Sequence, residues 1–417
     1  MRQRNTRYNI LNAIAASVAL SMIQPYVGIL AIKLGADNQQ LGYLSAWPNL
    51  LSVIAVLGVA AAVARSNQKK RLIAGIFLAG RAAALGAAAV PFFPEATRVW
   101  ALIGFWVLSV FPTSAAGTAQ QSFLADVFPG HERARAFAAR QSWSTGAGMV
   151  VVMVTGWLLD SVFPEPLGYQ VMFAGSFLFA IIEVLFFLQM REEERSMESE
   201  PASQARPEAE SGGWRTYLQV FQHKPFVQFL LVSVPFHFTW QMAWPLFTRF
   251  QVSELAISNT MLSLVSVANS VAMMLSYPLW VKWAERKGHA AMIFQAAIHL
   301  ALAPVLTALV PNATWLVAVN LFTGIGVAGV MLLVLNNLLD VSPSEGRPVY
   351  LAVHSALISV SATIAPMVGA YMMDTFPVRT GLMISTVFRV LSAVQFYFWN
   401  RRIVKGKGNA ASAANRT

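Results

Sequence analysis

Twelve apolar stretches, each about 20 to 27 residues long, constrain the fold of this chain more than any other feature. A helix needs about 20 apolar residues to cross a hydrocarbon core about 30 Å thick, because it rises about 1.5 Å per residue. Charged residues make up only 12% of the chain, and hydrophobic residues make up 56%. We therefore predict an all-α membrane protein with twelve transmembrane helices. The predicted spans cover residues 10–33, 40–64, 72–93, 98–124, 136–159, 168–190, 226–250, 256–281, 290–310, 313–338, 350–373 and 380–400.

A polar segment at residues 191–224 separates the first six stretches from the second six. It is rich in Glu, Ser, Pro and Ala, and it cannot bury enough apolar surface to offset the conformational entropy lost on ordering. We therefore expect a loop there. The predicted domains are a six-helix bundle over 1–190, the linker over 191–224, a second six-helix bundle over 225–404 and a tail over 405–417.

Lys and Arg are concentrated in alternate loops, and basic residues next to a span are retained on the cytoplasmic side. Arg133, Arg135 and Arg140 form one of these basic clusters, at the start of the fifth span. Both termini and the linker are accordingly predicted to be cytoplasmic, in a multi-pass protein of the cytoplasmic membrane. The opposite side holds only Lys33, Arg98, Arg249 and Arg379.

This charge distribution also accounts for the net charge of +11, so a nucleic-acid partner is not expected. The chain has no cysteine, which excludes disulfides and thiolate ligands. A glycine-rich phosphate loop and a metal-ligand spacing are both missing from the sequence. We therefore expect no enzymatic activity, no cofactor and no metal, and a monomer in the lipid bilayer.

An internal repeat relates the two halves of the chain. The segment LADVFPGHERARAFAARQSW at 124–143 aligns with LLDVSPSEGRPVYLAVHSAL at 338–357, at a constant offset of 214 residues. Two parallel six-span repeats joined by a cytoplasmic linker are an architecture of secondary transporters, whose site lies between the halves near the bilayer midplane. The aligned pairs include Asp126 with Asp340, Pro129 with Pro343, Arg133 with Arg347, and Asp160 with Asp374.

Over nearly its whole length the chain resembles the major facilitator superfamily. That family carries a G-x-x-x-D-R-x-G-R-K signature between spans 2 and 3 and a weaker copy between spans 8 and 9. Here WVKWAERKGH supplies Glu285 and Arg286 in the second copy, with Val281 in place of the glycine. The first copy, AAAVARSNQKKR, keeps the basic run but lacks the acidic residue and the glycines.

The resemblance implies a cytoplasmic gate in which acidic residues pair with basic residues and helix ends. We expect Asp126 to pair with Arg133, and Asp340 with Arg347, at the cytoplasmic mouth. The alternative is a positive-inside anchor that keeps its partners during function. The predicted gate residues are Asp126, Arg133, Glu285, Arg286, Asp340 and Arg347.

The resemblance also implies that spans 1, 4, 7 and 10 line a central cavity. In span 7, the spacing of His237, Trp240, Gln241 and Trp244 places them on one helical face. Substrate contact and helix-to-helix hydrogen bonding are both open roles for the polar members. The predicted cavity residues are Gln24, Tyr26, Gln120, Gln121, His237, Trp240, Gln241, Trp244, Asn336 and Asn337.

The interiors of these four spans contain no carboxylate, so a buried acid is not expected to hold a cationic substrate. His237 is the titratable candidate for proton coupling, since an imidazole titrates near physiological pH; a helix contact is the alternative. Arg81 in span 3 and Glu183 in span 6 lie at matching depth. Each is costly alone in a membrane, so we predict that they form a pair, either structural or coupled to protons.

The leading hypothesis is a secondary transporter that works by alternating access on a small molecule. Export of an amphipathic, neutral or anionic compound is slightly favoured, because the predicted cavity face combines aromatic side chains with uncharged amides. A nutrient or metabolite importer is the alternative. A second alternative is a sensor or assembly factor that has this fold without transport activity.

Overall fold

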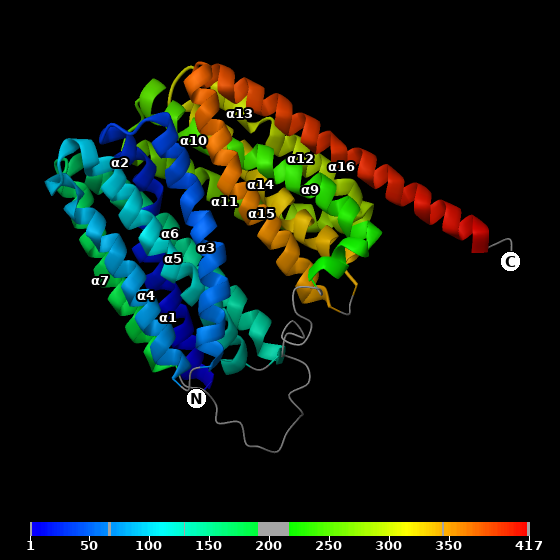
Figure 1. Ribbon diagram of the computed structural model, residues 1–417, viewed down its shortest axis with the longest axis horizontal. Helices are drawn as coiled ribbons and strands as arrows, with labels where there is room; N and C mark the ends of the chain where they lie inside the picture. The colour runs from blue at the N-terminus through cyan, green and yellow to red at the C-terminus, as the bar shows by residue number, and fades with distance from the viewer. Residues whose placement is uncertain (1, 66–67, 129, 191–216, 344–345, 415–417) are drawn as a thin grey trace. The chain divides into compact units, whose positions relative to one another are not determined.

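The computed structural model describes residues 2–65, 68–128, 130–190, 217–343 and 346–414. Within these ranges the regular structure is entirely helical (Figure 1). Every predicted span coincides with a helix or with a pair of consecutive helices. The twelve-helix fold expected from the sequence is therefore confirmed.

The first six spans are built from helices interrupted by two short 3-10 turns. The first turn begins at Gln24 and contains Pro25, which lacks the amide needed to continue a helix. The second contains Pro91 and closes the third span. The elements are α1 (Arg2–Ser21), η1 (Gln24–Tyr26), α2 (Val27–Lys33), α3 (Asn38–Arg65), α4 (Lys69–Gly86), η2 (Ala87–Phe92), α5 (Glu95–Val127), α6 (Gly130–Ser161) and α7 (Leu167–Gln189).

The second six spans begin after the short turn η4 (Val220–Gln222). Span 7 is divided between α9 and α10 where Pro245 follows Trp244, and a π-helical turn, η5, follows it. The elements are α9 (Lys224–Met242), α10 (Trp244–Arg249), η5 (Phe250–Glu254), α11 (Asn259–Lys287), α12 (His289–Ala301), α13 (Ala303–Ala308), α14 (Trp315–Val341), α15 (Arg347–Thr375) and α16 (Val378–Ala414). The last helix continues through residues 405–414, which the sequence assigns to the tail.

Ten segments of the described residues are long and apolar enough to cross a membrane. The other two predicted spans correspond to α3 and to α9 with α10. In the latter, the break at Ala243 shortens each continuous helix.

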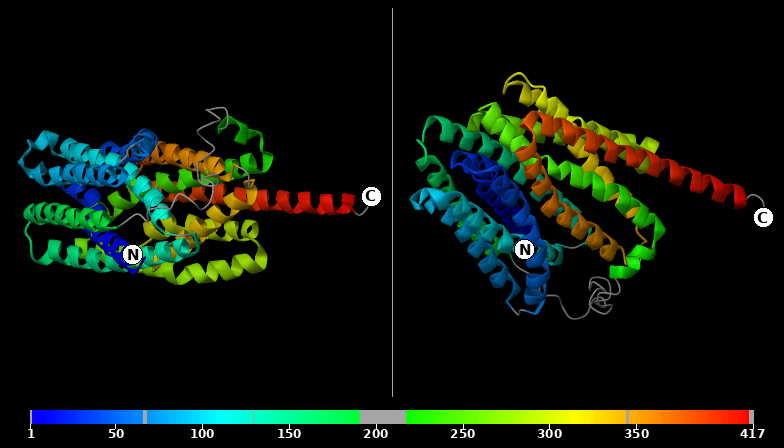
Figure 2. Two further views of the ribbon diagram at one scale, coloured as in Figure 1. Left: turned by 90° about the horizontal axis from the view of Figure 1, so that it is seen from below. Right: turned by 45° about the horizontal axis from the view of Figure 1, so that its top comes forward.

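The helices form two compact units (Figure 2). Unit 1 comprises Met1–Ser199 with Gln251–Val267, and unit 2 comprises Glu200–Phe250 with Ala268–Thr417. Helix α11 therefore begins in unit 1 and continues in unit 2. The linker boundaries stay a prediction, because 191–216 lie outside the described residues.

The two units repeat one packing scheme. In unit 1, α1 packs on α6 and α7, and α4 packs on α7; in unit 2, α9 packs on α15 and α16, and α12 packs on α16. A glycine permits one of these contacts: a Cβ on Gly369 of α15 would lie 2.0 Å from the carbonyl oxygen of Met242 on α9. Spans 1 and 5 thus meet as spans 7 and 11 do, and both interfaces contain buried polar residues.

Candidate functional site

Unit 1 contains a buried polar network centred on Arg140 of α6. Its Nη1 donates hydrogen bonds to Oδ1 of Asn9 at 3.0 Å and to Oδ1 of Asn12 at 2.7 Å, both on α1. Its Nη2 donates to Oε1 of Gln120 on α5 at 3.3 Å. Asn9 and Asn12 lie one helical turn apart, so their amides face the same neighbour. Three helices therefore hold one guanidinium group.

The network continues to an ion pair between α4 and α7. Nη2 of Arg81 lies 3.0 Å from Oε2 of Glu183, and both side chains are less than a tenth exposed. The predicted pairing of Arg81 with Glu183 is confirmed. Asn12 joins the two parts, because its Nδ2 donates to the carbonyl oxygen of Glu183 at 2.8 Å.

Among the residues that the structure describes, two guanidinium groups and one carboxylate belong to this network, so these residues carry a net positive charge. Around Arg140 the bonded acceptors are carbonyl oxygens, which bind a cation without neutralising it. Such uncompensated charge is costly in a low-dielectric environment. An anion placed beside Arg140 would remove that cost, and the Arg140 side chain is only partly buried.

The other predicted cavity residues of unit 1 lie apart from this network. Gln24 and Gln121 are exposed. Tyr26 is buried, and its hydroxyl contacts the carbonyl oxygen of Val152 at 2.6 Å and Oγ of Ser263 at 2.7 Å. Of the four, only Gln120 joins Arg140. Substrate contact by Gln24, Tyr26 and Gln121 stays a prediction.

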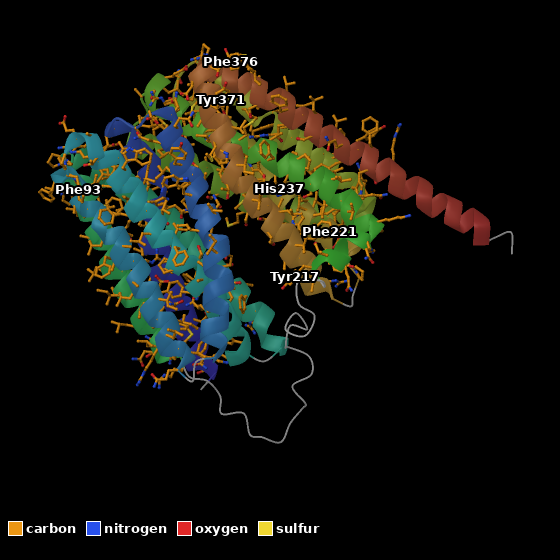
Figure 3. All side chains as sticks on the ribbon, viewed as in Figure 1. Phe93, Tyr217, Phe221, His237, Tyr371 and Phe376 are labelled. Carbon is orange, nitrogen blue, oxygen red and sulfur yellow. The ribbon has the colours of Figure 1, made fainter. Side chains whose placement is uncertain are left out.

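Unit 2 contains a pair of histidines at the equivalent interface, between α9 and α15 (Figure 3 labels His237). Nδ1 of His237 donates to the carbonyl oxygen of Ser233 at 2.8 Å, one turn earlier on α9. Oγ of Ser233 lies 3.0 Å from Nε2 of His354. The two imidazole rings lie 6.0 Å apart and nearly perpendicular. Ser233 thus connects both rings.

A carbonyl oxygen can only accept, so Nδ1 of His237 carries the proton in this contact. Among the described residues, no hydrogen bond to Nε2 of His237 is present, and that nitrogen retains a lone pair. A proton arriving at Nε2 would make the ring cationic. This pair can therefore change charge, whereas the Arg140 network keeps its charge.

Some of the other predicted cavity residues of span 7 also form contacts within unit 2. Oε1 of Gln241 accepts a hydrogen bond from Oγ of Ser361 at 2.7 Å. Trp240 is half-buried and packs against His237, with ring centroids 5.9 Å apart, whereas Trp244 is exposed. Arg389 of α16 is fully buried and donates to the carbonyl oxygen of Trp240 at 3.0 Å.

The amide pair on α14 lies apart from the histidines. Asn337 is buried and donates to the carbonyl oxygen of Leu333 in its own helix at 2.7 Å. Asn336 is half-buried. The contact of Asn337 stays within α14, and substrate contact by these two amides stays a prediction.

At the predicted gate, Asp340 pairs with His289, whose Nδ1 lies 2.7 Å from its Oδ2. Arg347, the expected partner, begins α15, and its buried Nε has no hydrogen-bond partner among the described residues. Glu285 and Arg286 are exposed at the end of α11. The side chains of Asp126 and Arg133 lie outside the described part of the structure. Gating by these residues stays a prediction.

Asp160 at the end of α6 caps the start of α11 within unit 1. Its Oδ1 accepts from the backbone amide of Asn259 at 3.0 Å, and its Oδ2 accepts from that of Thr260 at 2.7 Å. The approach is close because Gly156 has no side chain: a Cβ there would lie 2.6 Å from the carbonyl oxygen of Asn259. The carboxylate therefore meets the positive end of a long helix.

Sequence reasoning missed Arg140 and His354 as site residues. Arg140 follows Arg133 and Arg135 and is assigned with them to a cytoplasmic cluster, but the structure places it inside the membrane-spanning part of α6. The repeat offset of 214 residues relates Arg140 to His354 and was the signal that could have found both. Within the described ranges, no group of three His, Asp or Glu side chains is placed to hold a metal ion.

Comparison with known proteins agrees with this architecture. The family model described as Major Facilitator Superfamily matches residues 10–247 and again residues 229–416. No curated protein matches the chain.

Three solved transporter structures illustrate the fold similarity. The inward-facing, unoccupied bacterial homologue of the human lysosomal transporter Spinster is 15% identical, with a TM-score of 0.66 and 97% of both chains covered. A variant of the nucleoside transporter NupG is 12% identical, with a TM-score of 0.74 and coverage of 94% of this chain and 99% of that one. The xylose transporter XylE from E. coli is 16% identical, with a TM-score of 0.65 and coverage of 94% and 96%. At these identities the likeness concerns the fold alone.

Proposed function

Because the chain belongs to the major facilitator superfamily, we propose that it is a secondary active transporter that exports a small amphipathic anion by alternating access. The family and the twelve-helix fold support transport as the general activity. The anionic character of the substrate, the direction and the coupling are the specific parts of the proposal.

The network around Arg140 carries the proposal for an anion. It has one positive charge more than negative charges, and Asn9, Asn12 and Gln120 orient the guanidinium group. A carboxylate, sulfonate or phosphate of the substrate would pair with Arg140, since a guanidinium binds such planar or tetrahedral anions with two parallel hydrogen bonds. Neutral amides would hold Arg140 when no substrate is bound.

The aromatic side chains of span 7 support an amphipathic substrate. Trp240, Trp244 and His237 follow one another along α9 and α10, and Trp244 is exposed. Their ring faces suit an apolar body, as aromatic surfaces bury large areas of hydrocarbon. Export is the direction that we propose, because amphipathic anions enter a cell through its bilayer in their protonated form and are trapped inside when ionised.

Proton coupling is assigned in this proposal to His237 with His354. Both imidazoles are buried, and Ser233 bonds to each of them. A proton that enters on Nε2 of His237 would charge unit 2 at the interface that corresponds to the Arg140 interface of unit 1. Binding of the substrate anion and binding of the proton would then change the charge of different units.

The distribution of Lys and Arg supports the orientation of the proposed exporter. Basic residues are concentrated at the N-terminus, before α4 and in the linker, which are alternate loops of the sequence, so we place both termini and the linker in the cytoplasm and the chain in the cytoplasmic membrane.

The test is transport in proteoliposomes of purified protein, with a panel of radiolabelled aromatic carboxylates, their neutral amides and a sugar, with and without a pH gradient. We expect the carboxylates to be transported and Arg140→Gln to abolish their transport. Arg135→Gln is the matched control, since Arg135 lies on the same helix with an exposed side chain. Transport of the sugar or of the amides, unaffected by Arg140→Gln, would overturn the anion assignment. No transport of any compound would favour a sensor or assembly factor.

A further inference from the structure

Unit 1 contains a cavity at the end of the bundle where α2 ends and α5 and α7 begin, near Phe93 in Figure 3. It is a cavity of about 300 Å³ between α2, η2 and the first turns of α5 and α7. Gln170, in its wall, lies thirteen residues before Glu183 on α7, which corresponds to about 20 Å along a helix. The cavity is therefore separate from the Arg140 network.

Two cations and one carboxylate line this cavity. Nζ of Lys33 pairs with Glu165 and lies over the ring of Tyr169, 5.6 Å from its centroid. Nε of Arg98 donates to the carbonyl oxygen of Phe93 at 3.0 Å, and its Nη1 lies 3.5 Å from Oε1 of Glu95.

Both cations retain the capacity to bind an anion. In the part of the chain that the structure describes, Nη2 of Arg98 has no bonded acceptor. The side chains of Lys33 and Arg98 are each about a third exposed, at 34% and 32%. They can turn toward a ligand at little cost, because partly exposed ion pairs are weak.

An apolar groove adjoins the cavity on the outer face of the bundle. It is a shallow, open depression of about 450 Å³ between η2 and α7, and apart from Gln170 it is lined by small or aliphatic side chains and by Phe92. Phe92 is 82% exposed at its rim. Gln170 belongs to both hollows, and its Nε2 donates to the carbonyl oxygen of Ala88 at 3.0 Å, so the cavity and the groove share one wall.

We propose that a phospholipid occupies these two hollows, with its phosphate between Lys33 and Arg98 and one acyl chain in the groove. The positions of the charged and apolar parts support this ligand. The cations lie at the end of the spans, at the depth of lipid headgroups. The groove runs from there along membrane-spanning helices. A soluble phosphate would use the cations and leave the groove empty. A diacylglycerol would use the groove and bring no phosphate to the cations.

The carboxylate of Glu165 adds a preference within the phospholipids. When the phosphate pairs with Lys33, Glu165 loses its partner and can accept the ammonium group of an ethanolamine headgroup beside the ring of Tyr169. Phosphatidylethanolamine is therefore expected to bind more tightly than phosphatidylglycerol.

The experiment is native mass spectrometry of the purified full-length protein, delipidated and titrated with dioleoylphosphatidylethanolamine, dioleoylphosphatidylglycerol, dioleoylglycerol and glycerol 3-phosphate. We expect one phospholipid to be retained at low stoichiometry. Lys33→Gln with Arg98→Gln should weaken its retention at least tenfold, and dioleoylglycerol and glycerol 3-phosphate should not compete.

One further variant tests the groove independently of the cations, and another serves as a control. Ala174→Phe, on the exposed groove-lining side of α7, should weaken phospholipid binding by filling the groove while leaving the cations in place. Lys282→Gln, an exposed cation on α11, is the control and should bind as the wild type does. Retention unchanged in the Lys33/Arg98 variant, equal retention of dioleoylglycerol, or displacement by glycerol 3-phosphate would each overturn the proposal. Should the double variant fail to fold, Ala174→Phe decides the question alone.

Discussion

Arg140 and His354 lie 214 residues apart and occupy equivalent positions in the two repeats, each bonded to the first helix of its own unit. Arg140 reaches Oδ1 of Asn12 on α1 at 2.7 Å, and His354 reaches Oγ of Ser233 on α9 at 3.0 Å. The two interfaces are equivalent in the repeats, but their side chains differ in chemistry. One repeat places a guanidinium group there, and the other places an imidazole.

The planar geometry of the Arg140 guanidinium group should affect transport as well as its charge. Arg140→Lys keeps the charge but replaces the planar guanidinium, whose two Nη atoms reach α1 and α5 separately, with a single ammonium nitrogen. Loss of one charge-assisted hydrogen bond costs about 1.5 to 3 kcal/mol, so we expect the substrate concentration for half-maximal transport to rise about 10- to 100-fold. Transport kinetics in proteoliposomes measure this, with Arg135→Lys alongside. Unchanged kinetics would assign Arg140 to structure alone.

The pair between Arg81 and Glu183 should show the behaviour of a buried ion pair. Glu183→Gln leaves Arg81 buried without a counter-charge and should destabilise the protein by about 3 to 5 kcal/mol. Replacing both residues by Leu should cost less than this single change, because no charge is left buried. Thermal unfolding in detergent compares the three proteins. A double variant as unstable as Glu183→Gln, or less stable than it, would contradict the assignment.

His237 tests proton coupling. Among the described residues, Nδ1 of His237 bonds within α9 alone, so His237→Phe should leave the fold intact while it removes substrate binding or its dependence on pH. The comparison is with His299→Gln, in which an amide can still donate to the carbonyl oxygen of Phe322 that His299 now contacts at 2.8 Å. The pH profile of transport is the measurement. A His237→Phe protein with wild-type affinity and an unchanged profile would show that this ring serves packing only.

Asp160 should hold the first turn of α11 in place. Asp160→Ala removes a helix cap, which costs about 0.5 to 2 kcal/mol, and hydrogen exchange at the amides of Asn259 and Thr260 should become faster. Asp37→Ala is the comparison, since Asp37 bonds the amide of Gln40 in α3 instead. If both substitutions had the same effect on α11, the contact with Asp160 would not be what holds that turn.

The proposed orientation can be checked with single cysteines, because the natural chain has none. In whole cells, a membrane-impermeant maleimide should label Thr97→Cys at the start of α5. Ser203→Cys in the linker should react only after the membrane is permeabilised. The reverse pattern would invert the topology that the basic residues predict.

The sequence was sufficient to predict the structural features that depend on composition and on the spacing of apolar and charged residues. Span lengths follow from bilayer thickness, and the pairing of Arg81 with Glu183 follows from the cost of either charge alone at the same depth. Those arguments need no knowledge of rotamers or helix rotation.

The partners of other residues depended on packing that the sequence does not specify. Asp340 pairs with His289 across the ends of α12 and α14, although Arg347 is nearer to it along the chain. In unit 2, the buried Arg389 donates to the carbonyl oxygen of Leu300 at 3.3 Å, and no acidic partner is present among the described residues. A carbonyl acceptor has no signature in the sequence, and for the same reason the amide and serine contacts of Arg140 and His354 were not anticipated.

The division of α11 constrains how the molecule can change shape. Its residues up to Val267 belong to unit 1, where Asp160 binds its first amides, and its residues from Ala268 belong to unit 2. A helix backbone resists stretching, because each turn is closed by its own hydrogen bonds. Any rotation of unit 2 as a rigid body must therefore bend α11 near this boundary or detach its first turn from Asp160. Detachment would break the three hydrogen bonds that Asp160 accepts from Asn259 and Thr260, so Asp160→Ala would make this route easier and would leave the bending of α11 unaffected.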